Sequence, residues 1–255
     1  MLLRRPAVLA LLLAFSGCMK IREDLIVLPD GSGRLTFTFS IANRGEAAGF
    51  TEAELMSGDP DEIAEKVRGL AAMTRPVLEK ADGEVRIRMT AYFDDVNALK
   101  FMDDGEGEKA KPKQEFRFRK TGEAFTLELL GNLLADEVPE RAPGDPEREK
   151  QKEEMFKAMF AGFGFRNDVK MPGTVTEADG FTSKAGRVAS YRVEEKDLQK
   201  PADQKKINAL TRFKVSCGKS EMSDAELADF RKELDQAKAA WPELRKEMKK
   251  KSERK

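Results

Sequence analysis

The chain has 255 residues, of which 40% are hydrophobic and 36% are charged, and its 46 basic residues balance its 46 acidic residues. This composition is typical of a folded protein with a heavily solvated surface, and the absence of net charge means that no overall field attracts nucleic acid. The sequence contains no histidine and only two cysteines, which excludes histidine-dependent triads, histidine-bearing zinc sites, thiolate zinc clusters and CxxC redox chemistry.

The first 17 residues have the pattern of a signal peptide. Two arginines precede an apolar run over 7–15, and its nine residues would extend only about 14 Å as a helix. Because the hydrocarbon core of a bilayer is about 30 Å thick, this run is too short to span it. Small residues supply a cleavage site between Gly17 and Cys18, so we expect a mature chain that begins at Cys18. The alternative is a buried N-terminal helix of a cytosolic protein.

The sequence Phe-Ser-Gly-Cys at 15–18 resembles the lipobox of bacterial lipoproteins, in which a large residue, two small residues and a cysteine follow one another. This resemblance implies that cleavage falls between Gly17 and Cys18, that the Cys18 thiol receives a diacylglyceryl group, and that the new amino group takes a further acyl chain such as palmitate. Two or three acyl chains anchor a protein stably, whereas one chain anchors it only marginally. Met19 stands where an aspartate would signal retention at the inner membrane, so the outer membrane or the cell surface is favoured.

Alternating apolar and polar residues follow in the first half of the mature chain and predict β-strands. Turn sequences that contain glycine separate these strands in pairs, which predicts three antiparallel hairpins. The hairpins join 21–28 to 34–41, 76–80 to 85–93, and 115–119 to 125–130. Apolar residues at helical spacing predict a helix over 61–73. These elements predict an α+β fold over 18–218, with a mainly antiparallel, one-faced sheet of β-hairpins packed with a few helices.

The next segment, over 135–152, is charged and contains prolines, as is typical of a linker or an excursion from the domain. A helix predicted over 147–162 carries methionine and phenylalanine residues on one side. These residues are Met155, Phe156, Met159 and Phe160, with Phe163 just beyond them. They could bind a hydrophobic ligand or lie on a membrane, or they could be an ordinary part of the core.

Several segments resemble a family of bacterial lipoproteins that includes the mycobacterial LppM type. The resemblance rests on Cys18 before an extended segment, the Asp-Gly-Ser-Gly turn at 30–33, the Pro-Gly step within 171–175, and a closing strand over 188–193. It covers residues 18–198 of the chain. It implies an envelope-anchored, β-rich domain that binds a lipid or glycolipid, with no catalytic residues to carry over.

The C-terminal segment, 219–255, is predicted to be a charged helical tail. Ser223 and Glu226 have the spacing of a capping box, and apolar residues follow at helical spacing. Pro242 is expected to interrupt this helix, because proline lacks the donor of an i→i−4 hydrogen bond. Residues 243–255 contain seven basic and three acidic residues, which favours either a solvated, fraying end or attraction to anionic lipid headgroups.

Acidic residues and the remaining cysteine are the last candidates for chemistry. One acidic group comprises Asp94, Asp95, Asp103, Asp104 and Glu106. Its spacing does not match an EF-hand calcium loop, and acidic residues beside glycines are typical of solvated loops. Glu194 and Glu195 would point to opposite faces of a strand, so they cannot converge as paired carboxylates. Cys217 lies among apolar residues and is predicted to be a packed strand residue rather than a nucleophile.

We therefore predict a membrane-anchored, non-enzymatic envelope lipoprotein with a surface binding or scaffolding role, with a lipid or another hydrophobic molecule as a candidate ligand. The alternative is a carboxylate- or metal-dependent hydrolase of the cell envelope. The lipidated Cys18 and the basic C-terminal tail would contact the membrane. The sequence has no Walker loop and no dinucleotide fingerprint, and we predict no cofactor, metal site, catalytic residue or nucleic-acid partner. Protein partners are left open.

Overall fold

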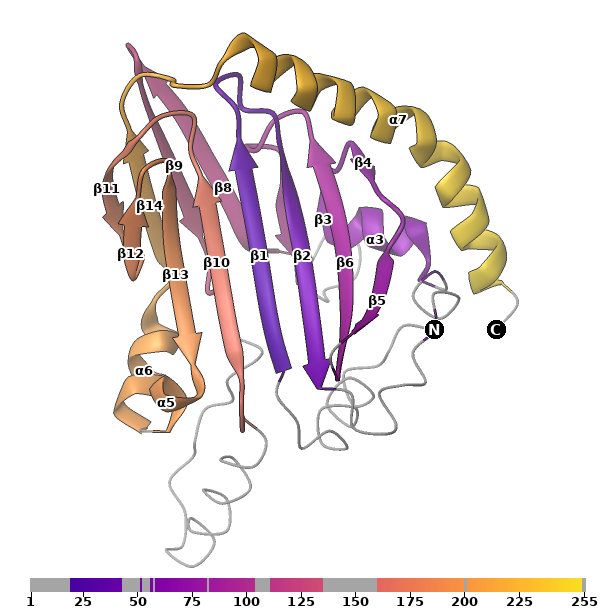
Figure 1. Cartoon of the computed structure of the whole chain (residues 1–255), viewed down its shortest axis with the longest axis horizontal. Coiled ribbons are helices and arrows are strands. Elements are labelled where there is room, and N and C mark those ends of the chain that lie inside the picture. Colours follow the sequence, from indigo (N-terminus) through magenta and orange to yellow (C-terminus); the bar gives the residue numbers. More distant parts are fainter. Residues whose placement is uncertain are drawn as a thin grey trace, which may run out of the picture.

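The structure is a computed structural model that describes residues 19–42, 51, 56, 58–81, 83–103, 111–134, 160–199 and 201–253. Within this part of the chain, the strands form an eight-stranded sheet, sheet A, and a six-stranded sheet, sheet B. The two sheets lie one behind the other, and helices cover their ends and one side (Figure 1).

Sheet A has the strand order β12-β13-β10-β1-β2-β6-β4, with β5 also paired to β6. Its strands are β1 (Met19–Val27), β2 (Gly33–Ala42), β4 (Ala72–Met73), β5 (Val77–Ala81), β6 (Glu84–Phe93), β10 (Gly164–Lys170), β12 (Ser183–Ala185) and β13 (Val188–Glu194).

Sheet B has the strand order β11-β14-β9-β8-β7-β3. Its strands are β3 (Val67–Arg68), β7 (Lys100–Met102), β8 (Pro112–Thr121), β9 (Ala124–Leu130), β11 (Val175–Asp179) and β14 (Arg212–Cys217). The helices with described bounds are α3 (Pro60–Lys66), α5 (Glu195–Leu198), α6 (Pro201–Ala209) and α7 (Asp224–Ser252).

All three predicted hairpins form, and the predicted α+β class is confirmed. β1 pairs antiparallel with β2, β5 with β6, and β8 with β9. Gly31, Gly83 and Gly122 at the three turns have φ values of 86°, 73° and 62°. Glycine adopts this left-handed conformation without the steric cost of a Cβ, so the glycines of the sequence mark the turns correctly.

The expectation of a single sheet is wrong, because the third hairpin belongs to sheet B while the first two belong to sheet A. The inner faces of the two sheets meet in the main core. Its fully buried side chains include Leu25, Val27 and Val169 from sheet A and Leu127, Leu129, Phe213 and Val215 from sheet B. Each sheet is therefore apolar on the face that it turns toward the other.

The helix predicted over 61–73 is too long. α3 ends at Lys66, and the chain then forms the short strands β3 and β4, which pair with β7 and β6. Gly69, between these strands, has a φ of 80° and lies so close to the backbone of Ala98 that a Cβ would clash. Gly69 lies two residues beyond Val67, the C-cap of α3, and its lack of a Cβ lets the backbone pass close to Ala98 in the loop before β7.

α7 packs along the domain rather than fraying from it. Its cap is the predicted capping box, because Ser223 Oγ accepts from the Glu226 amide and the Glu226 carboxylate accepts from the Ser223 amide. The buried residues of the helix are Phe230, Leu234, Ala237, Trp241, Leu244 and Met248. They form a second core cluster with residues that include Leu28, Ala72 and Tyr92.

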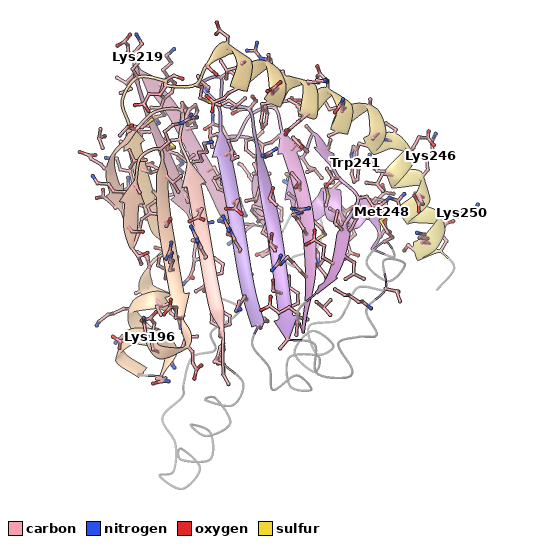
Figure 2. All side chains as sticks on the ribbon, in the orientation of Figure 1. Lys196, Lys219, Trp241, Lys246, Met248 and Lys250 are labelled. Carbon is pink, nitrogen blue, oxygen red and sulfur yellow. The ribbon has the colours of Figure 1, made fainter. Side chains whose placement is uncertain are left out.

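The expectation that Pro242 interrupts the helix is also wrong. α7 continues through Pro242, which is exposed to solvent. Proline inside a helix removes one hydrogen bond and bends the helix, and Figure 1 shows α7 curving from the end of sheet A onto its side. Figure 2 shows Trp241 and Met248 on the side of α7 that faces the strands, with Lys246 and Lys250 on the outer side. The buried side chains on both sides of Pro242 hold the bent helix in place.

Two predicted segments fall largely outside the described residues, namely the linker over 135–152 and the helix over 147–162 as far as residue 159. Among the helices that the structure describes, none is long and apolar enough to cross a membrane.

Replacing Trp241 with alanine tests the docking of α7. The Trp241→Ala change removes a side chain that is only 9% exposed, so we expect the free energy of unfolding to fall by about 3 kcal/mol in a urea titration. Lys246→Ala, on the outer side of the helix where the lysine side chain is 72% exposed, is the control and should change it by less than about 0.5 kcal/mol. Equal, small effects of the two changes would contradict the docking.

The ion pairs beneath the last turns of α7 predict a pH dependence. Hydrogen bonds from Arg75 and then Lys251 lower the pKa of Glu247 to about 2. Because the pKa is lower in the folded state than in the unfolded state, this stabilisation is complete above the ordinary carboxylate pKa and is lost as the pH falls toward about 2. We expect urea midpoints measured between about pH 5 and pH 2 to fall less in Glu247→Gln than in the unchanged protein. Glu243→Gln is the control, since the Glu243 side chain is 76% exposed. This change should leave the fall of the urea midpoint between about pH 5 and pH 2 as it is in the unchanged protein.

Candidate functional site

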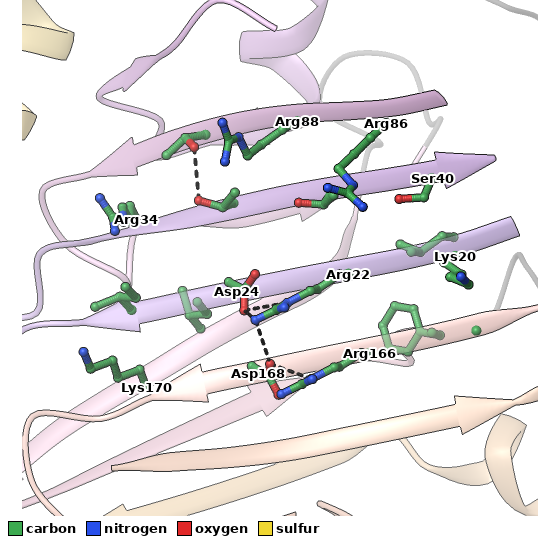
Figure 3. A pocket seen from close by; sticks show the side chains of 18 of the residues that line it. Lys20, Arg22, Asp24, Arg34, Ser40, Arg86, Arg88, Arg166, Asp168 and Lys170 are labelled. Atoms are coloured by element: carbon green, nitrogen blue, oxygen red, sulfur yellow. Dashed lines mark hydrogen bonds and ion pairs between the residues drawn. The ribbon is translucent and has the colours of Figure 1, made fainter. Parts of the chain in front are cut away.

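The outer face of sheet A is polar and is hollowed into a groove with a cavity volume of about 1290 Å³ (Figure 3). The alternation of residues along each strand explains this polarity. On β2, Leu35 and Phe37 belong to the core between the sheets, whereas Thr36 and Thr38 line the groove. We call this surface the sheet A groove.

Cross-strand register places arginines side by side in the groove. Arg22 on β1 lies opposite Arg166 on β10, which lies opposite Arg192 on β13. In the other direction, Arg22 lies opposite Thr38 on β2, which lies opposite Arg88 on β6. We call these five residues the arginine row. Neighbouring strands are about 4.8 Å apart, so the row extends about 19 Å across the sheet.

Basic residues outnumber acidic residues in the lining of the groove. Its nine described basic residues are Lys20, Arg22, Arg34, Arg75, Arg86, Arg88, Arg166, Lys170 and Arg192. Its four described acidic residues are Asp24, Glu79, Asp168 and Glu194. Three carboxylates outside the lining reduce this excess of positive charge. Glu84 pairs with Lys20, Glu233 with Arg34, and Glu247 with Arg75.

Asp168 holds two members of the arginine row. The residue is 6% exposed, and the Ser190 hydroxyl donates to its Oδ1 at 2.6 Å. Its Oδ2 lies 2.7 Å from Arg166 Nε and 3.4 Å from Arg22 Nη2. Asp24 accepts from Arg22 at 2.8 Å, and this hydrogen bond is the main cause of the raised pKa of Arg22. The two aspartates therefore orient Arg22 and Arg166 within the groove.

Arg192 differs from these two arginines. Within the described part of the chain, no ion pair joins its guanidinium to a carboxylate, although its charge contributes to the lowered pKa of Glu194. The main cause of that lowered pKa is a hydrogen bond from Lys196. The guanidinium of Arg192 is thus available to a molecule in the groove.

The residues predicted as a lipid or ligand site are only partly described. Gly17 and Cys18 lie outside the described residues, as do Met155, Phe156 and Met159. Phe160 and Phe163 are 5% and 4% exposed and belong to the core between the sheets. Their ring centroids are 5.4 Å apart in an edge-to-face arrangement. These two phenylalanines pack against each other in the core.

The acidic residues considered as a metal site lie at separate contacts. Asp94 pairs with Lys238 of α7 at 2.5 Å, and Asp95 accepts from the amide and the side chain of Asn97. Asp104 and Glu106 lie outside the described residues. Elsewhere, Glu195 begins α5 and accepts from the Gly162 amide. Among the residues that the structure describes, no group of three or more cysteine, aspartate and glutamate residues is placed to hold a metal ion.

Cys217 is buried in β14 within the core, as predicted. Burial is the main cause of the raised pKa of its thiol, and a raised pKa disfavours the reactive thiolate.

Several basic residues of the C-terminal segment bind the domain itself. Arg245 and Lys249 both pair with Asp61 in the first turn of α3, and Lys251 pairs with Glu247 one turn earlier on α7 itself. These ion pairs neutralise part of the positive charge that was predicted to attract anionic lipid headgroups.

No family model matches the sequence, and no curated protein matches it either. Among solved structures, the chain is similar to the folded domain of the LppM protein from Mycobacterium tuberculosis, determined by NMR. The sequences are 13% identical, the TM-score is 0.37, and the match covers 83% of this chain and 95% of that domain. A similarity of this size assigns no function to the chain.

The sheet A groove was not predicted from the sequence. One signal was present, because the run Val-Arg-Ile-Arg at 85–88 alternates and places two arginines on one face of a strand. The other arginines come from β1, β10 and β13, and only the register of the assembled sheet aligns them. The alternation therefore indicates a polar face but not the arginine row.

Asp168→Ala tests the support of the arginine row. The change leaves Arg166 without its described carboxylate partner, and it removes the acceptor of the buried Ser190 hydroxyl. We expect the free energy of unfolding in urea to fall by about 2 kcal/mol, because a buried donor without a partner is costly. Asp24→Ala is the matched control, since the Asp24 side chain is 31% exposed, and its effect should stay below about 1 kcal/mol. A larger loss of unfolding free energy in Asp24→Ala than in Asp168→Ala would contradict a supporting role for Asp168.

Proposed function

We propose that the protein is an envelope lipoprotein, held at a membrane by lipid on Cys18, with a non-enzymatic binding or scaffolding role at the membrane surface. The residue after Cys18 is methionine rather than aspartate, and this favours the outer membrane or the cell surface over the inner membrane.

The observation that carries this proposal is the position of β1 in the chain. β1 begins at Met19, the residue directly after Cys18. The domain would therefore begin at the anchor with no intervening linker, and Lys20 of the groove lies two residues from the lipid attachment site. Nine residues of strand extend about 30 Å, so β1 would carry the groove from the bilayer surface outward.

Binding at the outer face of sheet A is favoured over binding of a hydrophobic molecule between the sheets. The described space between the sheets is occupied by side chains of the main core, including Phe160 and Phe163. The outer face is instead open to solvent, and its lining includes many charged and hydroxyl groups. This arrangement supports recognition of a polar partner.

Changing Cys18 to alanine tests the anchor. In a bacterial host, the unchanged protein should sediment with membranes, and its intact mass should correspond to residues 18–255 plus acyl chains. Cys18→Ala should lose the added mass and leave the membrane fraction, because no other anchor is proposed. Cys217→Ala changes the other cysteine of the chain and should keep both properties. A native product that retains residues 1–17 and carries no lipid would overturn the proposal.

A further inference from the structure

The arginine row presents three guanidinium groups on adjacent strands, and Thr38 separates them from the fourth, on Arg88. Arginine binds carboxylate and phosphate groups through parallel N–H donors. The hydrogen bonds that Arg22 makes within the described chain use its Nε and Nη2 atoms, so its Nη1 remains as a donor. Arg192 contributes a guanidinium without an ion pair in the described chain. The row can therefore bind anions even though aspartates already orient two of its members.

Hydroxyl groups accompany the arginines in the groove. Thr36, Thr38 and Ser40 line its centre on β2, and Thr36 Oγ1 lies 3.1 Å from Thr90 Oγ1 on β6. A hydroxyl both donates and accepts, as do the hydroxyls of a sugar. The lining thus combines donors for anionic groups with partners for neutral polar groups.

The size of the groove indicates an elongated ligand. Its volume of about 1290 Å³ exceeds the range of about 300–1,000 Å³ that is usual for small-molecule pockets. The arginine row is about 19 Å long, which is longer than any single sugar or phosphate group. A chain that bears several anionic groups would use the whole row.

The apolar surface of the domain does not favour a bilayer as the occupant. Among the described residues, Val77 is the one large apolar side chain that is exposed, at 42%, and it lines the groove from β5. A surface that enters a bilayer presents several large apolar side chains. Binding of single-stranded nucleic acid uses exposed aromatic rings, whereas Phe165, the described aromatic residue of the lining, is 3% exposed.

We propose that the sheet A groove binds an acidic glycan, a sugar chain that bears carboxylate or phosphate groups. This inference rests on the proposed function, which places the domain where envelope glycans are met, and it names the partner of the binding role. The guanidinium groups of the arginine row bind the anionic groups of the chain, and the threonine and serine hydroxyls bind its sugar hydroxyls.

Titration of the full-length protein in a neutral detergent with fluorescent polygalacturonate, which bears one carboxylate per sugar, tests the proposal. Neutral dextran of matched length is the control ligand. We expect the unchanged protein to bind polygalacturonate and not dextran, with an affinity that weakens as salt is added. The pair Arg166→Gln and Arg192→Gln should raise the Kd by about tenfold or more, because both guanidinium forks are lost.

The pair Lys246→Gln and Lys250→Gln is the matched control. It makes the same change in net charge, but on the outer side of α7 (Figure 2) and at residues that do not line the sheet A groove, and it should change the Kd by less than about twofold. Arg166→Lys with Arg192→Lys keeps the charge and removes the planar fork, and it should weaken binding by an intermediate factor. Arg192→Gln alone should also weaken binding, and it breaks no described ion pair, so it serves if the Arg166 change impairs folding.

The proposal is overturned if the unchanged protein binds dextran as well as polygalacturonate, or binds neither. Equal weakening by the arginine pair and the lysine pair would also overturn it, because binding would then follow net charge alone. A third contrary result is a preference for phosphatidylglycerol over phosphatidylcholine vesicles that depends on the arginine pair more strongly than polygalacturonate binding does. Loss of lipid at Cys18 would contradict the proposed function while leaving binding of polygalacturonate by the purified protein intact.

Discussion

The pairing of β1 with strands on both sides is the constraint on which the rest of the structure depends. β1 pairs antiparallel with β2 and parallel with β10, so the start of the folded domain and its later half form one sheet. Its alternation places Leu25 and Val27 in the core and Arg22 and Asp24 in the groove. A slip of one residue would exchange these two faces. The register of β1 therefore determines the core and the groove together.

α7 covers a second apolar cluster that lies outside the core between the two sheets. Its apolar stripe packs with Leu28, Ala72 and Tyr92, while ion pairs such as those of Arg245 and Lys249 with Asp61 flank the apolar contact. Exposed ion pairs contribute little individually, so burial of the apolar stripe is the main stabilising term. The ion pairs have another consequence, because they occupy part of the basic charge of the C-terminal segment. The cationic groups that remain accessible in a regular arrangement are those of the arginine row, on the outer face of sheet A.

Local sequence patterns were sufficient to predict much of the secondary structure. The turn glycines and the alternating runs predicted the three hairpins, and Ser223 with Glu226 predicted the start of α7. The errors arose where distant contacts prevailed. The helix predicted over 61–73 ends at Lys66, because the next residues pair with β7 as β3, and Gly69 then passes close to the backbone of Ala98. At Pro242 the burial of neighbouring side chains in the second core cluster offsets the lost hydrogen bond.

The sequence by itself determined the short apolar run over 7–15, the lipobox-like pattern at 15–18, the strand periodicity and the exclusion of histidine chemistry. These properties depend on residue identity and on spacing within a few residues. Only the tertiary structure decided that the hairpins divide between two sheets, that α7 lies against the domain, and that Arg22, Arg166 and Arg192 stand side by side. Those arginines lie on strands that are far apart in the chain. Their alignment follows from inter-strand register, which the hydrogen bonds and core packing of the whole sheet determine and no local pattern contains.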